Sequence, residues 1–136
     1  MEIIESSRCS YCFIEAETIE HLFCTCTFAV TFYMQIVEWA SEIGIGMPII
    51  SYDNIVLQNF EGDHLSLKNL LILLYKMIVF EKRGKETEIN LCYFKAKVKN
   101  VERIEKRIAT KKGKLGGHYK KWSAYCNFVQ ENNNSS

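Results

Sequence analysis

The residues best suited to chemistry lie close together near the start of the chain, in CSYCFIEAETIEHLFCTC at 9–26. Four of the six cysteines and one of the three histidines fall within this stretch. Cysteine thiolates and histidine nitrogens are the usual ligands of zinc, and a CxxC turn such as that from Cys9 to Cys12 directs two thiolates at one ion. The stretch therefore predicts a metal site.

With His21 as the third ligand and Cys26 as the fourth, the spacing is C-x2-C-x8-H-x4-C. Three thiolates and one imidazole complete a tetrahedral shell and leave no position for a substrate water, so the pattern favours a structural zinc ion over a catalytic one. Cys24 is an alternative fourth ligand, because a residue three positions after His21 shares its face of a helix. Bound zinc would supply folding free energy, on the order of 10 kcal/mol, to a segment with few apolar residues.

Composition predicts a globular, intracellular setting for this site. Hydrophobic residues make up 48% of the chain and aromatic residues 12%, enough for a core. The N-terminus does not have the pattern of a secretory signal. The most apolar stretch, 70–80, contains Lys76 and is shorter than the ~20 residues of a membrane span. We expect a cytoplasmic or nuclear protein with no membrane partner, where reducing conditions favour metal-bound cysteines over disulfides.

The elements that must position the site are predicted to be helices. Apolar residues recur at helical spacing over 27–43, 61–84 and about 88–110, with Asp63 or Ser66 as the cap of the second helix. The expected fold is mainly α: a small CCHC zinc-binding knuckle followed by a helical domain of about three to four helices.

Between and after these helices the patterns are less decisive. The segment 54–60 reads as a strand or an extended connector, and three glycines within 111–122 weaken any continuous helix there. The predicted organisation is a zinc-binding module at 1–27, a helical domain with a basic C-terminal part at 28–125, and a disordered tail at 126–136.

The net charge of +1 hides a strong asymmetry. From Lys76 to Trp122 there are 15 Lys/Arg and 5 Glu, a balance of +10, and the remainder holds 2 Lys/Arg and 11 Asp/Glu, a balance of −9. This layout indicates a polyanionic partner such as a nucleic acid. Its phosphates would contact the Lys and Arg side chains, and its unpaired bases would stack on aromatic side chains. The candidate nucleic-acid-binding residues are Lys106, Arg107, Lys111, Lys112, Lys114, His118, Lys120, Lys121 and Trp122. The alternative is that Tyr119 and Trp122 pack a last helix into the core and the cations only solvate a helix surface.

The run CSYCFIEAETIEHLFCTCTF resembles the zinc-binding segment that follows the polymerase domain in reverse transcriptases of non-LTR (LINE-type) retrotransposons. The shared features are a CxxC, acidic residues, an E-T-x-E-H-L-F word, a cysteine five places after the histidine and an aromatic-rich helix. A looser likeness at 72–84 and in the basic helix beyond extends the resemblance to about residues 5–125. It implies that Cys26 rather than Cys24 is the fourth ligand. Two departures are Phe13, where a glycine-like turn residue is expected, and the additional thiol of Cys24.

The resemblance implies a role in holding template RNA or target DNA, but not polymerase activity. Two-metal nucleotidyl transfer needs clustered carboxylates, and the chain has no Tyr-x-Asp-Asp and only two aspartates, Asp53 and Asp63. Because it begins at Met1, a few residues before the cluster, we expect no enzyme here, at most part of a larger reverse transcriptase.

The first functional hypothesis is an accessory zinc-stabilised module that binds RNA or DNA through the phosphate backbone, with a polymerase domain or another protein as a further partner. One alternative is a zinc-stapled protein-interaction adaptor derived from a retroelement, with the apolar stripe of the third helix as its docking face. Another is a decayed element fragment without selected activity.

Overall fold

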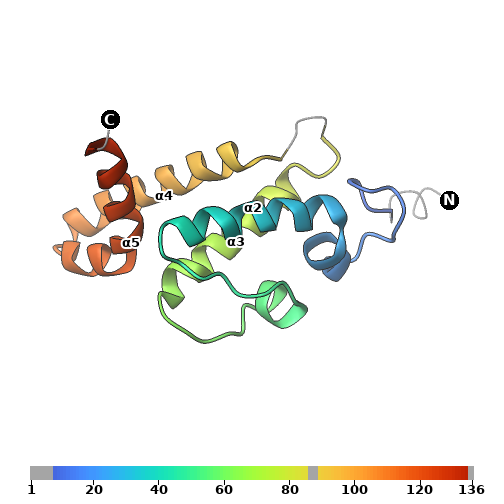
Figure 1. Ribbon diagram of the computed structural model, residues 1–136, viewed down its shortest axis with the longest axis horizontal. Helices are drawn as coiled ribbons and strands as arrows, with labels where there is room; N and C mark the ends of the chain where they lie inside the picture. The colour runs from blue at the N-terminus through green and yellow to red at the C-terminus, as the bar shows by residue number, and fades with distance from the viewer. Residues whose placement is uncertain (1–7, 86–88, 135–136) are drawn as a thin grey trace.

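The computed structural model describes residues 8–85 and 89–134, with side chains as far as residue 130. Two π-helical turns and four α-helices account for most of this chain (Figure 1). They are η1 (His21–Thr25), α2 (Thr27–Glu42), η2 (Tyr52–Val56), α3 (Leu65–Glu81), α4 (Leu91–Lys111) and α5 (Leu115–Asn134). In the described ranges the β pairing is limited to one isolated bridge, between Arg8 and Ala16. The predicted mainly α fold, with a Cys/His cluster ahead of a helical domain, is confirmed.

Helix α2 forms where the apolar periodicity predicts it. Its buried residues recur at steps of three and four, and so build one apolar face. The helix ends at Glu42, and Gly44 follows with a φ of +87°, a conformation that glycine adopts without a Cβ penalty. The buried residues of α2 are Ala29, Phe32, Tyr33, Ile36, Trp39 and Ala40.

Helix α3 supplies the centre of the core through Tyr75, which is fully buried. The rings of Phe32 and Tyr33 lie 5.7 and 5.1 Å from the Tyr75 ring, so α2 and α3 pack through aromatic contacts. The Tyr75 hydroxyl lies 2.8 Å from the carbonyl oxygen of Phe23 and 3.2 Å from that of Ala29. This side chain therefore ties α3 to the junction between η1 and α2.

The start of α3 and the segment before it differ from the prediction. Neither Asp63 nor Ser66 caps the helix, because the N-cap residue is His64, in a left-handed conformation without a side-chain cap. The segment predicted as a strand or connector overlaps η2, in which Ser51 accepts a hydrogen bond from the Asn54 N–H. The strand interpretation of 54–60 is therefore wrong where it overlaps η2, at 54–56.

Helix α4 is long and only its first half is covered by the core. Phe94 and Val98 are fully buried, and Phe94 packs edge-on against Trp39. Further along the same predicted stripe, Ile104 is 59% exposed and Ile108 is 47% exposed. The second half of the stripe is therefore a surface feature.

Helix α5 folds back along the end of α4, which Figure 1 shows at the side of the molecule far from the N-terminus. The chain turns at Gly113, whose φ is +69°, and the other two glycines of this region, Gly116 and Gly117, lie in the first turn of α5. The helix then continues to Asn134. The disordered tail predicted from residue 126 is thus wrong as far as Asn134, and 135–136 lie outside the described residues.

One hydrophobic core joins all of these parts. It runs from Cys9 and Cys26 through α2 and α3 to Trp122 on α5. Consequently the boundary predicted at residue 27 does not separate two independently packed units. Across the described parts of the chain, no helix combines the length and apolar character that crossing a membrane requires.

Candidate metal centre and cationic surface

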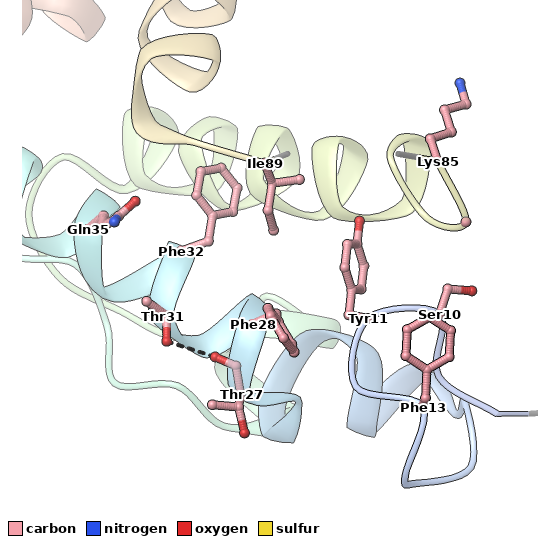
Figure 2. Close-up of a pocket in the computed structure, with 11 residues that line it drawn as sticks. Ser10, Tyr11, Phe13, Thr27, Phe28, Thr31, Phe32, Gln35, Lys85 and Ile89 are labelled. Atoms are coloured by element: carbon pink, nitrogen blue, oxygen red, sulfur yellow. Dashed lines mark hydrogen bonds between the residues drawn. The ribbon is translucent and has the colours of Figure 1, made fainter. Parts of the chain in front are cut away.

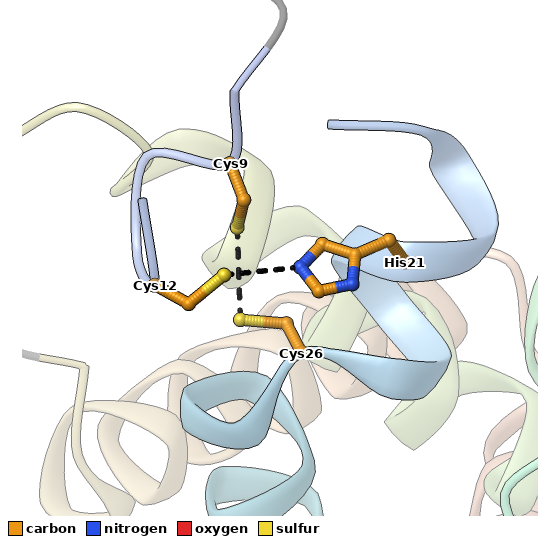
Figure 3. Close-up of side chains that lie close together, drawn as sticks. All are labelled: Cys9, Cys12, His21 and Cys26. Atoms are coloured by element: carbon orange, nitrogen blue, oxygen red, sulfur yellow. Dashed lines mark hydrogen bonds between the residues drawn. The ribbon is translucent and has the colours of Figure 1, made fainter. Parts of the chain in front are cut away.

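The structure brings Cys9, Cys12, His21 and Cys26 together in one cluster, with each potential ligand atom within 4.8 Å of the others. Cys9 Sγ lies 3.6 Å from Cys26 Sγ, and Cys12 Sγ lies 3.3 Å from His21 Nε2. Around a tetrahedral zinc ion, with Zn–S about 2.3 Å and Zn–N about 2.0–2.1 Å, neighbouring ligand atoms lie about 3.6–3.8 Å apart. Figure 3 shows the two contacts crossing like opposite edges of a tetrahedron. The four residues can therefore hold a metal ion.

The π-helical turn η1 explains why Cys26 joins this cluster. In an α-helix, residues five apart differ by roughly 140° around the axis, which would point His21 and Cys26 apart. In η1 the Cys26 N–H donates to the His21 carbonyl oxygen at 2.7 Å, the i→i+5 bond of a π-helix, which nearly aligns the two residues. The alternative ligand, Cys24, is not part of the cluster, and burial raises the pKa of its thiol.

His21 is oriented by Thr25, a residue that the ligand spacing did not single out. Thr25 Oγ1 lies 2.8 Å from His21 Nδ1, and the threonine hydroxyl donates to the His21 carbonyl oxygen at 3.4 Å. With its hydrogen directed there, the hydroxyl oxygen accepts from Nδ1–H, and Nε2 keeps a free lone pair toward Cys12. Such a partner fixes both the tautomer and the ring orientation of a metal-binding histidine. Thr18 caps this segment by accepting from the His21 N–H at 3.0 Å.

Backbone N–H groups point at two of the thiols. Those of Glu15 and Ile14 hydrogen-bond to Cys12 and lower the pKa of its thiol to about 6. Burial raises the pKa of Cys26 to about 11, and the N–H groups of Ala29 and Phe28 oppose that rise. Hydrogen bonds of this kind favour the thiolate, which is the form that binds metal.

Glu17 connects the cluster to α3. Its Oε1 accepts from the backbone N–H and the hydroxyl of Ser10, both at 3.2 Å, and its Oε2 lies 3.0 Å from Arg83 Nη1. The Glu17 side chain is only 11% exposed, so this ion pair is largely shielded from water. Tyr11 adds a second connection, since its hydroxyl donates to the Val79 carbonyl oxygen. The turn between the first two cysteines is thereby held against the end of α3.

The turn after Cys12 keeps the left-handed geometry for which a glycine was expected. Phe13 has a φ of +60°, and its N–H donates to the Cys9 carbonyl oxygen at 3.0 Å. A non-glycine residue in this region is strained because its Cβ approaches the following carbonyl oxygen. The Phe13 side chain gains little from burial, since it is 69% exposed.

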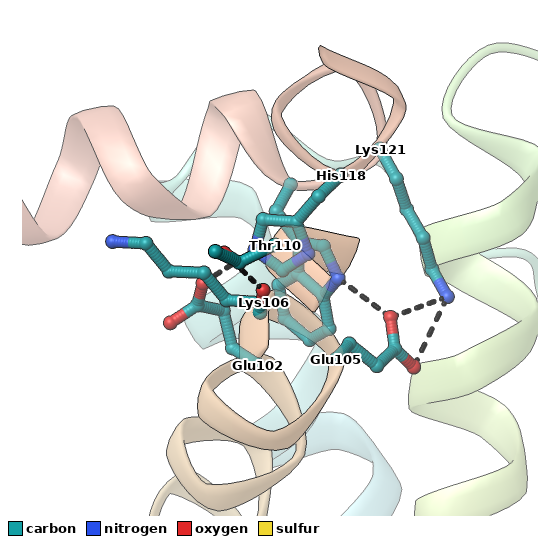
Figure 4. Close-up of polar contacts among 7 residues, drawn as sticks. Glu102, Glu105, Lys106, Thr110, His118 and Lys121 are labelled. Atoms are coloured by element: carbon teal, nitrogen blue, oxygen red, sulfur yellow. Dashed lines mark hydrogen bonds and ion pairs between the residues drawn. The ribbon is translucent and has the colours of Figure 1, made fainter. Parts of the chain in front are cut away.

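At the other end of the molecule, the two acidic residues of α4 both face α5 (Figure 4). Glu102 Oε2 lies 2.6 Å from His118 Nε2, in a pair whose histidine side chain is 2% exposed. Glu105 Oε1 accepts from the Trp122 indole N–H at 2.9 Å and lies 3.0 Å from Lys121 Nζ. Glu102 therefore pairs with His118 on α5 rather than with Lys106, its i,i+4 neighbour on α4.

These contacts correct part of the predicted nucleic-acid site. Trp122 is fully buried and His118 is stacked on it and 6% exposed, so neither ring is available to an unpaired base. The alternative that the last helix packs into the core is confirmed for Trp122 and wrong for Tyr119, which is 43% exposed. Lys121 forms an ion pair with Glu105.

The other predicted cations remain on the surface. All are exposed, and within the described part of the chain none of them forms an ion pair. Arg103, which the sequence did not single out for this role, is also exposed and lies beside Lys106 and Arg107 along an open groove of about 510 Å³. We call these residues the cationic face: Arg103, Lys106, Arg107, Lys111, Lys112, Lys114 and Lys120.

Comparison with known proteins adds no relative to this description. No family model, no curated protein and no solved structure matches the chain.

Proposed function

We propose that this chain is an accessory module that binds zinc through Cys9, Cys12, His21 and Cys26, and binds RNA or DNA phosphates through its cationic face. The observation that supports nucleic-acid binding is the separation of negative and positive side chains on α4. Glu102 and Glu105 point at α5, where His118, Lys121 and Trp122 satisfy them. On the side of α4 away from these glutamates, Arg103, Arg107 and Lys111 have no carboxylate partner among the described residues.

Zinc is the metal that suits the cluster best. Thiolate-rich sites with tetrahedral geometry select zinc or iron–sulfur clusters, and one imidazole with three thiolates is a common structural zinc set. Four protein ligands leave no open position, so the ion would stabilise the fold rather than activate a substrate. This agrees with the burial of Cys9 and Cys26 in the common core.

The cationic face suits a phosphate backbone rather than a specific base sequence. Lys and Arg neutralise phosphates, and each contact contributes roughly 0.7–0.9 to the dependence of log affinity on log salt. The groove along Arg103, Arg107 and Lys111 is walled by the stems of cationic side chains. It presents no described aromatic ring for base recognition. The resemblance to reverse-transcriptase tails supports the same proposal, because it implies a role in holding template RNA or target DNA.

The test is binding of the purified, zinc-loaded chain to a labelled single-stranded RNA and to a DNA duplex over a range of salt concentrations. We expect affinity to fall linearly on a log–log plot as salt rises. Combined reversal at Lys106→Glu, Arg107→Glu and Lys111→Glu should reduce the slope by about 2–3 if each side chain contacts one phosphate.

A matched control separates contact from net charge. Lys68→Glu changes the net charge as much as Arg107→Glu does, but Lys68 lies on α3, outside the cationic face. Arg107→Glu should weaken binding more than Lys68→Glu. Equal effects, or no binding at low salt, would refute the nucleic-acid half of the proposal.

A second candidate, the protein-interaction adaptor, is favoured by the exposure of Ile104 and Ile108 on α4. Two exposed isoleucines one turn apart offer an apolar strip to a partner helix. Replacing both by serine should abolish a protein interaction and leave the salt-dependent binding of RNA intact. Charge reversal on the cationic face should have the opposite pattern.

A further inference from the structure

A hollow lies away from the cationic face, between the cysteine turn, the start of α2 and the chain before α4 (Figure 2). Its volume is about 780 Å³, within the range of ligand pockets. Four aromatic rings line it, and Figure 2 shows them following one another along the hollow: Phe32, Phe28, Tyr11 and Phe13. We name this hollow the aromatic pocket.

Two of these rings contribute little to the fold. Phe13 is 69% exposed and Phe28 is 56% exposed, and among the described rings neither pairs with another. Phe13 also holds a strained left-handed backbone, where glycine would fit better. Backbone strain that is not offset by burial is found preferentially where a ligand is held.

The other two rings give the pocket a rigid base. Phe32 is 2% exposed and packs against Phe94 at 6.0 Å. The Tyr11 hydroxyl is fixed by its hydrogen bond to the Val79 carbonyl oxygen. A ligand that stacked here would therefore immobilise few additional side chains, and little conformational entropy would be lost on binding.

The polar groups around the pocket suit a nucleotide. Gln35, Thr27 and Thr31 lie along the α2 wall and Lys85 lies at the rim. Amide and hydroxyl groups can bond to base edges, a lysine can approach a phosphate, and the rings offer faces to bases of any sequence.

We propose that the aromatic pocket stacks unpaired bases of a single-stranded nucleic acid whose backbone also lies on the cationic face; this rests on the function proposed above. Helix α4 connects the two sites. From Leu91 to Arg107 its axis rises about 24 Å. At about 3.4 Å per stacked nucleotide, one strand needs roughly seven nucleotides to span that distance.

The test compares the full, zinc-loaded chain with Phe28→Ala and Phe13→Gly, using labelled single-stranded 12-mers and 4-mers of thymidine and a 12-bp duplex. Each variant should lower affinity for the single-stranded 12-mer roughly 5- to 100-fold, leave the salt slope unchanged and have little effect on the duplex. Phe13→Gly relieves backbone strain, so weaker binding by a variant that folds at least as well is not explained by damage to the fold. As a control, Met34→Ala removes another exposed apolar side chain of α2 that lies outside the pocket. It should leave the affinity for the 12-mer and for the duplex unchanged.

Three outcomes would overturn the inference. In the first, both variants bind the 12-mer as tightly as the unaltered chain does, while charge reversal on α4 still weakens binding. The proposed function then stands, and base stacking in the aromatic pocket is refuted. In the second, the chain binds no nucleic acid at all, and both fail. In the third, ring NMR signals of Phe13 and Phe28 respond to a leucine-rich amphipathic peptide and not to the 12-mer, which makes the pocket a protein-docking site.

Discussion

The cysteine cluster and the α4–α5 hairpin both place polar side chains at the border of the core, but they satisfy them differently. In the cluster the four candidate ligands come from one stretch of sequence and converge on a point that a metal ion can occupy. In the hairpin His118 and Trp122 are satisfied by Glu102 and Glu105, which lie 16 and 17 positions earlier on another helix. The first arrangement is recognisable from residue spacing, whereas the second becomes visible only when the two helices are paired.

The largest expected effect is removal of the metal. Zinc binding in small structural sites is worth on the order of 10 kcal/mol, so chelation should unfold the segment from Cys9 to Cys26. Because that segment shares the core of α2 and α3, the melting temperature of the whole chain should fall. Elemental analysis should find about one zinc per chain before chelation. A chain that melts at the same temperature after its metal has been removed would contradict the metal assignment.

The next largest effect should come from the hairpin. Trp122→Ala removes a fully buried ring and leaves Glu105 without its indole donor, which should cost about 3–5 kcal/mol in the free energy of unfolding. Tyr119→Ala, on the same helix but 43% exposed, is the control and should stay within about 0.5 kcal/mol. Urea denaturation measures both. If the hairpin and the cysteine cluster are independent, Trp122→Ala should leave the zinc content unchanged. Loss of zinc from a folded Trp122→Ala variant would show that the two regions are coupled.

Thr25→Val tests whether the histidine orientation matters to the cluster. Valine keeps the shape of the side chain but cannot accept from His21 Nδ1, so zinc affinity should fall about 10- to 100-fold. Competition with a chromophoric chelator measures this. Thr31→Val is the control, since its hydroxyl donates to the carbonyl oxygen of Thr27 within α2 and, among the described residues, makes no bond to the cluster. Equal affinities for the two variants would assign Thr25 no role at the metal.

Glu17→Gln should have the smallest effect of the four. The variant loses the ion pair with Arg83 and weakens two hydrogen bonds from Ser10, a loss of about 1–2 kcal/mol in the free energy of unfolding. Glu20→Gln, an exposed residue of the same E-T-x-E-H-L-F word, should change stability by less than about 0.5 kcal/mol. If the urea midpoints of the two variants coincide, Glu17 does not fasten the cluster to α3.

Sequence reasoning succeeded where the determining interactions are local. The periodicity of α2 and the CxxC turn each depend on residues a few positions apart, so their geometry follows from spacing. Residue spacing left both Cys24 and Cys26 possible, and the choice of Cys26 came from the resemblance alone. Its physical reason is η1, because a π-turn shifts which residues share a face, and residue spacing does not reveal that shift. The burial of His118 and Trp122 depended on the pairing of α4 with α5. Packing of Trp122 in a last helix stayed one of two open alternatives, because three glycines near that turn weaken a continuous helix.

The connection from Glu17 to Arg83 also sets an order of events during synthesis. Arg83 is added 66 positions after Glu17. At about 5–20 residues per second, the ribosome needs roughly 3–13 seconds to add it. Cys26, the last of the four candidate ligands, precedes Arg83 by 57 positions, so for most of that interval all four ligands exist without the complete helix that supports them. If the cluster binds zinc as proposed, the nascent chain can capture the ion before its core exists, and a cell short of zinc would leave the thiols exposed at that stage.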